Sequence, residues 1–233
     1  MTRDESLVVI EGFHAVKHAV RFGAELVEVR VVDPGEVEAL AAELAADVAP
    51  ALRAAMTVVG PGELDGPTGQ RVPGRIVAVA RRPPDRVGEV LGRPAGDAPA
   101  VLLDEPRHLG NVGAAIRVAA AAGAEALATT GAADPWHPAA VRGAAGLQFA
   151  LPVGRVDVAS VRRPIVGLDP EGAPLAETPL PPGAVLAFGS ERRGLGDEVR
   201  AAAQATVSLP MRPGVSSLNL ATAVAAVLYT LRQ

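Results

Sequence analysis

Cysteine is absent from this 233-residue chain, which excludes disulfide bonds, thiolate metal ligands and cysteine nucleophiles. Aromatic residues make up only 3% of the chain although 49% of it is hydrophobic, so the core must be built mainly from Ala, Val and Leu. Lys17 is the only lysine, and arginine supplies the remaining positive charge. The formal net charge of −4 argues against a protein that coats nucleic acid, but it is compatible with local basic patches.

The sequence also lacks the patterns of a metal site and of a membrane span. Its four histidines are scattered, and the one pair with helical spacing, His14 and His18, has no carboxylate partner motif. We therefore expect no bound metal. No apolar run reaches membrane-spanning length, and charged residues stand where a signal peptide would have its apolar core. We expect a cytoplasmic protein.

The first third of the chain alternates between strand and helix patterns. Apolar alternation predicts strands at 8–10, 26–32, 56–59 and 75–80, and helical periodicity predicts helices at 12–22 and 36–52. This alternation predicts a small α/β domain over residues 1–82. The segment that follows is rich in proline and arginine, so residues 83–98 are predicted to be an exposed linker.

From residue 99 to the end, apolar strands again alternate with helices. The predicted strands are 100–103, 126–130, 149–153, 165–168, 184–188 and 206–209, and the predicted helices are 112–122, 138–145, 198–203 and 220–231. Asn111 is placed to cap the first of these helices. Strands separated by helices imply a mainly parallel sheet, and ligands of such sheets bind beyond the carboxyl ends of the strands. Residues 99–233 are therefore predicted to be a second α/β domain that holds the site.

Three loops of this second domain follow apolar strands and combine glycine with polar side chains. They read EPRHLGNVGAAIR (105–117), GSERRGLG (189–196) and PMRPGVSSLN (210–219). Because the carboxyl ends of parallel strands meet at one edge of the sheet, we expect the loops to form one pocket. The first loop lacks the G-x-G-x-x-G order of a dinucleotide site. Neither Glu191 nor Ser217 has the G-x-S-x-G elbow or nearby histidine of a hydrolase.

The order and spacing of the loops resemble the three motifs of the SpoU-type (TrmH-like) RNA ribose 2′-O-methyltransferases of the SPOUT superfamily. The resemblance covers about residues 100–233. It is carried by N-x-G-x-x-x-R from Asn111 to Arg117, by F-G-S-E-x-x-G-L from Phe188 to Leu195, and by L-P-M and S-S-L-N between Leu209 and Asn219. The segment GFHAVKHAVRFGAELVEV (12–29) is similar to the start of a small substrate-binding domain, itself like a ribosomal protein, that many members carry.

The resemblance implies a C-terminal α/β domain with a trefoil knot, in which the last segment threads a loop. It also implies S-adenosylmethionine as methyl donor, a ribose 2′-hydroxyl of structured RNA as acceptor, and a homodimer through the C-terminal domain. The residues implied for cofactor binding are Gly189, Leu209, Leu218, Glu191 and Ser217. The residues implied for catalysis are Arg117, Asn111, Glu191, Ser217 and Asn219.

The residue types can be checked against this chemistry. A sulfonium methyl group is already activated, so the demanding step is the alignment of a weakly acidic hydroxyl, and alignment can lower a barrier by about 7–11 kcal/mol. A guanidinium has a pKa above about 12 and is a poor proton acceptor, so we interpret Arg117 as stabilising the developing alkoxide and gripping a phosphate. The arginines expected to contact the RNA backbone are Arg81, Arg82, Arg86, Arg107, Arg192 and Arg193.

Two other functions are considered. One is an RNA-binding protein of the same fold that has lost catalysis, and Arg117, Glu191 and Asn219 argue against it. The other is a nucleotide-dependent oxidoreductase, which the missing dinucleotide fingerprint disfavours. Ribosomal and transfer RNA both remain candidate substrates, as do housekeeping and antibiotic-resistance roles.

Overall fold

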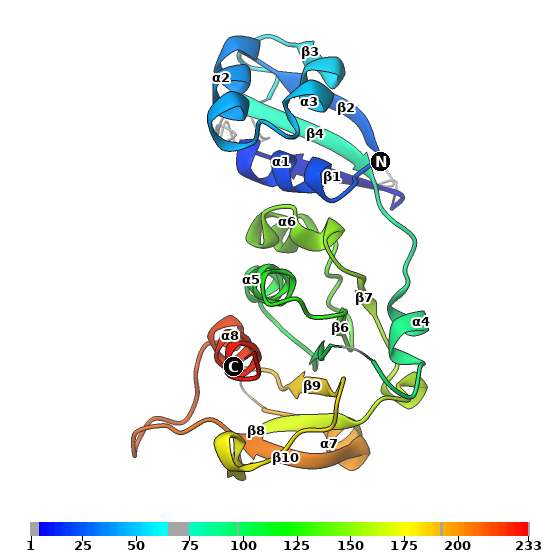
Figure 1. Ribbon diagram of the computed structural model, residues 1–233, viewed down its shortest axis with the longest axis vertical. Coiled ribbons are helices and arrows are strands. Elements are labelled where there is room, and N and C mark those ends of the chain that lie inside the picture. The colour runs from blue at the N-terminus through cyan, green and yellow to red at the C-terminus, as the bar shows by residue number, and fades with distance from the viewer. Residues whose placement is uncertain (1–4, 65–74, 97, 192, 233) are drawn as a thin grey trace. The chain divides into compact units, whose positions relative to one another are not determined.

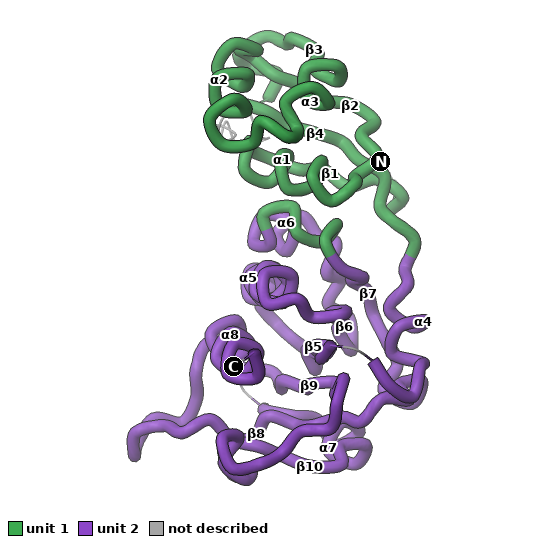
Figure 2. Tube along the Cα trace, in the orientation of Figure 1, with its two compact units in different colours: residues 1–84, 145–150 green, residues 85–144, 151–233 purple. Residues whose placement is uncertain are grey.

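The structure, a computed structural model, describes residues 5–64, 75–96, 98–191 and 193–232 (Figure 1). Arg192, one of the predicted RNA contacts, lies outside these ranges. The chain divides into two units, residues 1–84 with 145–150 and residues 85–144 with 151–233 (Figure 2). In the described part, no helix combines the length and the apolar character that crossing a membrane requires. The two units are described in turn.

The first unit is built on a four-stranded sheet with the order β1-β4-β2-β3. Its strands are β1 (Leu7–Glu11), β2 (Leu26–Val31), β3 (Met56–Val58) and β4 (Ile76–Arg81). Strand β4 is antiparallel to β1 and β2, whereas β2 and β3 are parallel. Ile10, Val29 and Ile76 are completely buried on one face, as alternation along a strand requires for a half-buried sheet. Strands and helices thus alternate along this unit.

Three helices pack on this sheet. Helix α1 (Phe13–Arg21) contacts β1 and β4, α3 (Ala49–Ala55) contacts β2, and α2 (Pro34–Leu44) lies against both helices. The prediction of one continuous helix over 36–52 was wrong, because the chain leaves the helix after Leu44 and begins α3 at Ala49. Pro50 has no backbone N–H and is tolerated only in a first helical turn, so the helix must restart beside it.

The second unit contains six parallel strands in the order β10-β8-β9-β5-β6-β7, which confirms the predicted parallel sheet. The strands are β5 (Ala100–Leu103), β6 (Leu127–Thr129), β7 (Val153–Arg155), β8 (Ile165–Pro174), β9 (Val185–Phe188) and β10 (Ala203–Ser208). The central strands β5 and β9 are buried along their whole length, as expected of a sheet covered on both faces.

Helices cover both faces of this sheet. Helices α4 (Val87–Leu91) and α7 (Asp197–Ala202) pack with Ala100 and Leu102 of β5 into one apolar cluster. Val101 and Leu103 point to the opposite face and are completely buried there. The other three helices are α5 (Leu109–Ala121), α6 (Pro138–Ala144) and α8 (Leu220–Thr230). Helix α5 lies between α6 and α8 and contacts both (Figure 1).

Gly113 allows α5 and α6 to approach closely. A Cβ atom at this position would collide with the backbone carbonyl of Ala140, and it would lie 2.8 Å from the backbone nitrogen of Ala144. Contacts of this kind leave no room for any side chain, so the glycine of the first motif has a packing reason of its own.

Several boundaries differ from the predictions. Helix α5 begins at Leu109 with His108 as its N-cap, so Asn111 lies inside the first turn and is not the cap. Residues 149–153 are not a strand: a short 3-10 helix, η2 (Leu147–Phe149), precedes Pro152, and β7 starts after it. Proline lacks the donor that a strand ladder needs, which explains the late start.

The predicted linker contains an ordered helix. Val87 and Leu91 of α4 are completely buried, and the backbone N–H of Val87 is bound by the Asp85 carboxylate at 2.9 Å. The prediction of an exposed connector rested on its prolines and arginines, which flank α4 and do not interrupt it.

Candidate functional site

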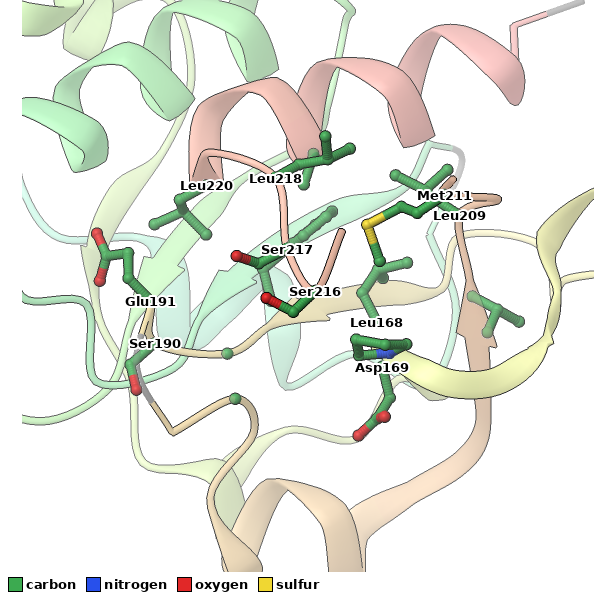
Figure 3. Close-up of a pocket in the computed structure, with 16 residues that line it drawn as sticks. Leu168, Asp169, Ser190, Glu191, Leu209, Met211, Ser216, Ser217, Leu218 and Leu220 are labelled. Atoms are coloured by element: carbon green, nitrogen blue, oxygen red, sulfur yellow. The ribbon is translucent and has the colours of Figure 1, made fainter. Parts of the chain in front are cut away.

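A pocket of about 350 Å³ lies in the second unit where β9 and β10 end and α8 begins. Gly189, Leu209 and Leu218, three of the five residues implied for cofactor binding, all line it. Glu191 and Ser217 also line it (Figure 3). The structure therefore brings the second and third loops together at one edge of the sheet, as predicted. No described residue of the first loop, 105–117, lines the pocket, so the prediction that all three loops form it was wrong for the first loop.

The pocket has chemically different ends. Figure 3 shows Glu191 and Ser190 at one end and Met211 and Leu209 at the other, with Ser217 between them. Apolar side chains complete the wall, among them Leu168, Phe188, Val207 and Leu220. Such a cavity suits an elongated ligand that has an apolar portion and a polar or cationic portion.

Gly189 allows the second loop to close tightly. The N–H groups of Ser190 and Gly194 each bond the other residue's carbonyl oxygen at 3.0 Å, and Gly194 has a φ of 67°, which favours glycine. A Cβ atom on Gly189 would collide with the backbone of Gly194 and Leu195. The loop therefore presents bare backbone to the pocket, where a ligand can approach peptide groups closely.

Three predicted residues form a hydrogen-bonded chain, which we call the amide relay: Asn219, Asn111 and Glu191. Asn219 Nδ2 donates to Asn111 Oδ1 at 3.1 Å, and Asn111 Nδ2 donates to Glu191 Oε1 at 2.8 Å. Asn219 is also the N-cap of α8, since its Oδ1 accepts from the backbone N–H groups of Ala221 at 3.0 Å and Thr222 at 3.4 Å. Each motif contributes one member of the relay, so the three motifs are locked together.

Opposing effects act on the pKa of the Glu191 carboxyl group. Burial alone would raise its pKa, but the hydrogen bond from Asn111, backbone N–H groups and the nearby His108 together outweigh burial and leave the pKa below its ordinary value. Its second carboxylate oxygen, Oε2, is buried and has no hydrogen-bond partner among the described residues. Glu191 is therefore an ionised carboxylate with one unused acceptor beside the pocket.

Not every predicted residue reaches the pocket. Asn111 is hydrogen-bonded to Glu191 and Asn219 to Asn111, but neither asparagine is among the described residues that line the cavity. Arg117 lies on the exposed surface of α5 and is not among the described lining residues either. Its predicted role is therefore not explained by the pocket of its own chain.

Strand β8 also contributes to the pocket, which was not predicted from the sequence. Leu168, Asp169 and Pro170 line the pocket. The signal was present, because the polar Asp169 follows the apolar run IVGL, as in the other strand-end loops. The strand was predicted to end at residue 168, whereas β8 continues to Pro174 through irregular pairing with β10.

Four of the six predicted RNA-contacting arginines fall into two groups, whereas the role of Arg82 stays a prediction. Arg81 pairs with Glu25 at 2.8 Å, and Arg86 pairs with Glu89 at 3.2 Å. Arg107 and Arg193 are exposed and form no ion pair with the described residues. Three more arginines of the first unit, Arg21, Arg30 and Arg53, are paired with carboxylates at 2.6–2.9 Å. Unpaired positive charge is thus found near the loops of the second unit.

Comparison with known proteins adds independent information. The sequence pattern of the SpoU rRNA Methylase family matches residues 98–229. The 23S rRNA (uridine(2479)-2′-O)-methyltransferase of Streptomyces viridochromogenes is 36% identical over 172 residues, which are 67% of this chain and 59% of that protein. The 23S rRNA (guanosine(2553)-2′-O)-methyltransferase RlmP of Bacillus subtilis (strain 168) is 26% identical over 236 residues, 96% of this chain and 88% of the relative.

A solved structure agrees with these sequence matches. The SpoU methyltransferase AviRb from Streptomyces viridochromogenes, in complex with the cofactor AdoMet, superimposes with a TM-score of 0.76 at 28% identity. The match covers 96% of this chain and 88% of that one. The family pattern spans more than half of the chain and includes all three motif loops, the parallel sheet and the pocket. This protein therefore belongs to the SpoU rRNA methylase family.

Proposed function

We propose that this protein transfers a methyl group from S-adenosylmethionine to a ribose 2′-hydroxyl of RNA, with ribosomal RNA as the substrate. The observation that carries the proposal is the pocket built by the second and third motif loops in a chain of the SpoU family. Two relatives are named as 23S rRNA 2′-O-methyltransferases, which favours ribosomal over transfer RNA. This substrate also favours a location in the cytoplasm.

The pocket residues fit the proposed cofactor. A cavity of about 350 Å³ with apolar walls and one acidic end suits an adenosine joined to a positively charged sulfonium. Gly189, Leu209 and Leu218 would hold the cofactor through their backbone groups. The ionised Glu191 favours a cation in the pocket. When bound, S-adenosylmethionine supplies an electrophilic methyl group.

The chain's own residues would then orient the acceptor. The amide relay fixes Glu191, so Asn111 and Asn219 act by positioning it. Ser217 is exposed at the pocket, where its hydroxyl can hydrogen-bond a ribose. Arg117 would stabilise the developing alkoxide and hold a neighbouring phosphate. Alignment by these groups would supply a large share of the rate enhancement.

The proposal includes a homodimer through the second unit. Arg117 is exposed and outside the pocket of its own chain, so a partner subunit offers it a pocket in which to act. Tyr229 and Leu231, at the end of α8, are 48% and 40% exposed and offer apolar surface for such an interface. We also propose the trefoil knot for this unit, supported by the family membership and by the packing of α8 on α5.

The domain roles follow from the same family membership. We propose that residues 1–82 select the RNA, that 83–98 connect the parts, and that 99–233 form the methyltransferase domain. The ion-paired arginines of the first unit imply that it would recognise RNA more by shape than by charge.

The direct test is methyl transfer. Purified protein, tritiated S-adenosylmethionine and ribosomal RNA should yield labelled RNA in which alkali does not cleave the phosphodiester bond after the modified nucleotide, because the methylated 2′ oxygen cannot attack the phosphate. Comparing 2′-O-methyl sites in cells with and without the gene should then reveal one lost site. Binding of RNA without any transfer would favour the inactive RNA-binding alternative. Binding of NAD in place of S-adenosylhomocysteine would favour the oxidoreductase.

A further inference from the structure

A buried carboxylate behind the pocket connects the first two loops of the second unit. Asp104 follows β5 and is only 5% exposed. Its Oδ2 accepts a hydrogen bond from the backbone N–H of Gly196 at 2.7 Å, and its Oδ1 accepts one from the Thr130 hydroxyl at 2.6 Å. Thr130 Oγ1 in turn accepts the backbone N–H of Glu105 at 2.9 Å. Both carboxylate oxygens are therefore used inside the protein.

The peptide group that joins Leu195 to Gly196 is also held by a cation, which binds its carbonyl oxygen. Arg200 on α7 donates from Nε to the carbonyl oxygen of Leu195 at 3.0 Å, and its Nη2 pairs with Asp169 Oδ2 at 2.7 Å. The Leu195 carbonyl and the Gly196 N–H belong to one peptide bond. That peptide thus has an anion at its positive pole and a cation at its negative pole, the arrangement its dipole prefers.

This clamped peptide adjoins the wall of the pocket. Gly189 and Gly194 line the cavity, and the Gly189 backbone lies so close to Gly194 and Leu195 that no side chain would fit between them. Asp169, the second partner of Arg200, also lines the cavity. A rotation of the Leu195–Gly196 peptide would therefore displace the wall that Gly189 presents to a ligand.

The backbone next to Asp104 is held in an unfavourable conformation. Glu105 has a φ of 44°, which a non-glycine residue adopts only when its surroundings hold it there. The hydrogen bond from its N–H to Thr130 does so, and Thr130 is itself held by Asp104. The Asp104 carboxylate thus fixes the start of the first loop and the end of the second.

We propose that Asp104 and Arg200 are positioning residues that set the affinity for a nucleoside cofactor by clamping the Leu195–Gly196 peptide. The inference rests on the proposed function, because it takes S-adenosylmethionine as the ligand of the pocket. Neither side chain is assigned contact with the ligand. Their effect reaches it through the Gly189 wall and, for Arg200, through Asp169.

The test is calorimetry with S-adenosylhomocysteine as the probe on full-length variants. Arg200→Ala and Asp104→Ala should each raise the Kd about tenfold, the effect of one lost hydrogen bond to a charged group. The double variant should bind about as weakly as either single one, because both side chains hold the same peptide. Asp104→Asn should retain most of the affinity, since an amide can accept from Gly196 and donate to Thr130. If Asp104→Ala does not fold, Arg200→Ala still tests the clamp, because Arg200 holds the same peptide from its carbonyl oxygen.

The matched control is Glu125→Ala. It breaks a 2.8 Å ion pair with Arg163, a side chain with no exposed surface, and neither residue belongs to the pocket. This variant should lower the melting temperature and leave the Kd within about twofold of the wild type. An unchanged Kd in folded Arg200→Ala and Asp104→Ala, or a loss matched by Glu125→Ala, overturns the inference. If the wild type itself fails to bind S-adenosylhomocysteine, the proposed function falls as well.

Discussion

Asn219 performs two tasks that substitutions can separate. Its Oδ1 caps α8, and its Nδ2 starts the amide relay to Asn111 and Glu191. Replacement by alanine removes both, at about 1 kcal/mol for the cap and about 1 kcal/mol for the hydrogen bond. A total loss of about 2 kcal/mol corresponds to a fall in melting temperature of about 4–8 °C for a chain of this size.

Asn219→Asp should separate the two tasks. A carboxylate caps a helix as well as an amide does and interacts favourably with the helix dipole, so the melting temperature should stay close to that of the wild type. It has no N–H to donate, so Asn111 would have to turn its amide group and would then present an oxygen to the ionised Glu191. We expect Asn219→Asp to be stable but to lose at least about tenfold in methyl transfer.

The assay combines thermal unfolding, followed by circular dichroism, with methyl-transfer kinetics on the same preparations. Asn219→Ala should be deficient in both measurements, and Asn219→Asp in the second alone. If Asn219→Asp methylated RNA at the wild-type rate, the amide relay would have no role in function. If it unfolded as early as Asn219→Ala, the division between cap and relay would be incorrect.

Three further predictions concern other parts of the second unit. The pKa of Glu191 is lower in the folded protein than in the unfolded chain, so its contribution to stability is present above the unfolded pKa of about 4.3 and is lost as the pH falls through the folded value. Glu191→Gln should therefore flatten the acidic part of the curve of melting temperature against pH. An unchanged curve would contradict the lowered pKa of Glu191. Arg117→Ala should abolish turnover while the Kd for S-adenosylhomocysteine stays near the wild-type value, and unchanged turnover would refute its role. Gly113→Ala should lower the free energy of unfolding by about 1–3 kcal/mol because α6 blocks the added methyl group, and a neutral result in chemical denaturation would show that α5 and α6 can separate at no cost.

The sequence was most informative where one local rule decides the structure. The short apolar runs AVLL and VLAF favoured buried strands, and the strand-end rule placed the polar residues after them at one edge of the sheet. The helix predicted over 36–52 was wrong although the sequence held the sign of a break, because Pro50 lacks the N–H that a helix interior needs. The second half of β8 could not be predicted from the sequence, because its residues have little strand preference and are held by pairing with β10.

The contacts of the site depend on side-chain geometry across long separations. Asn111 meets Glu191 from 80 positions away and Asn219 from 108 positions away, and no local pattern specifies these bonds. The order of the motifs indicated that Asn111, Glu191 and Asn219 belong to one site. It did not indicate that the two asparagines would hold Glu191 by hydrogen bonds. The position of Arg117 depends on which face of α5 stays uncovered, which the packing of α6 and α8 decides.

The paired arginines of the first unit affect how RNA binding should respond to salt. Affinity for a polyanion falls with rising salt in proportion to the number of phosphates that the protein neutralises, because counterions are released on binding. Arg21, Arg30, Arg53 and Arg81 already have carboxylate neighbours, so they would displace few counterions from the RNA. A plot of log affinity against log salt should therefore be shallow for this acidic protein, with its slope set by a few arginines such as Arg107 and Arg193.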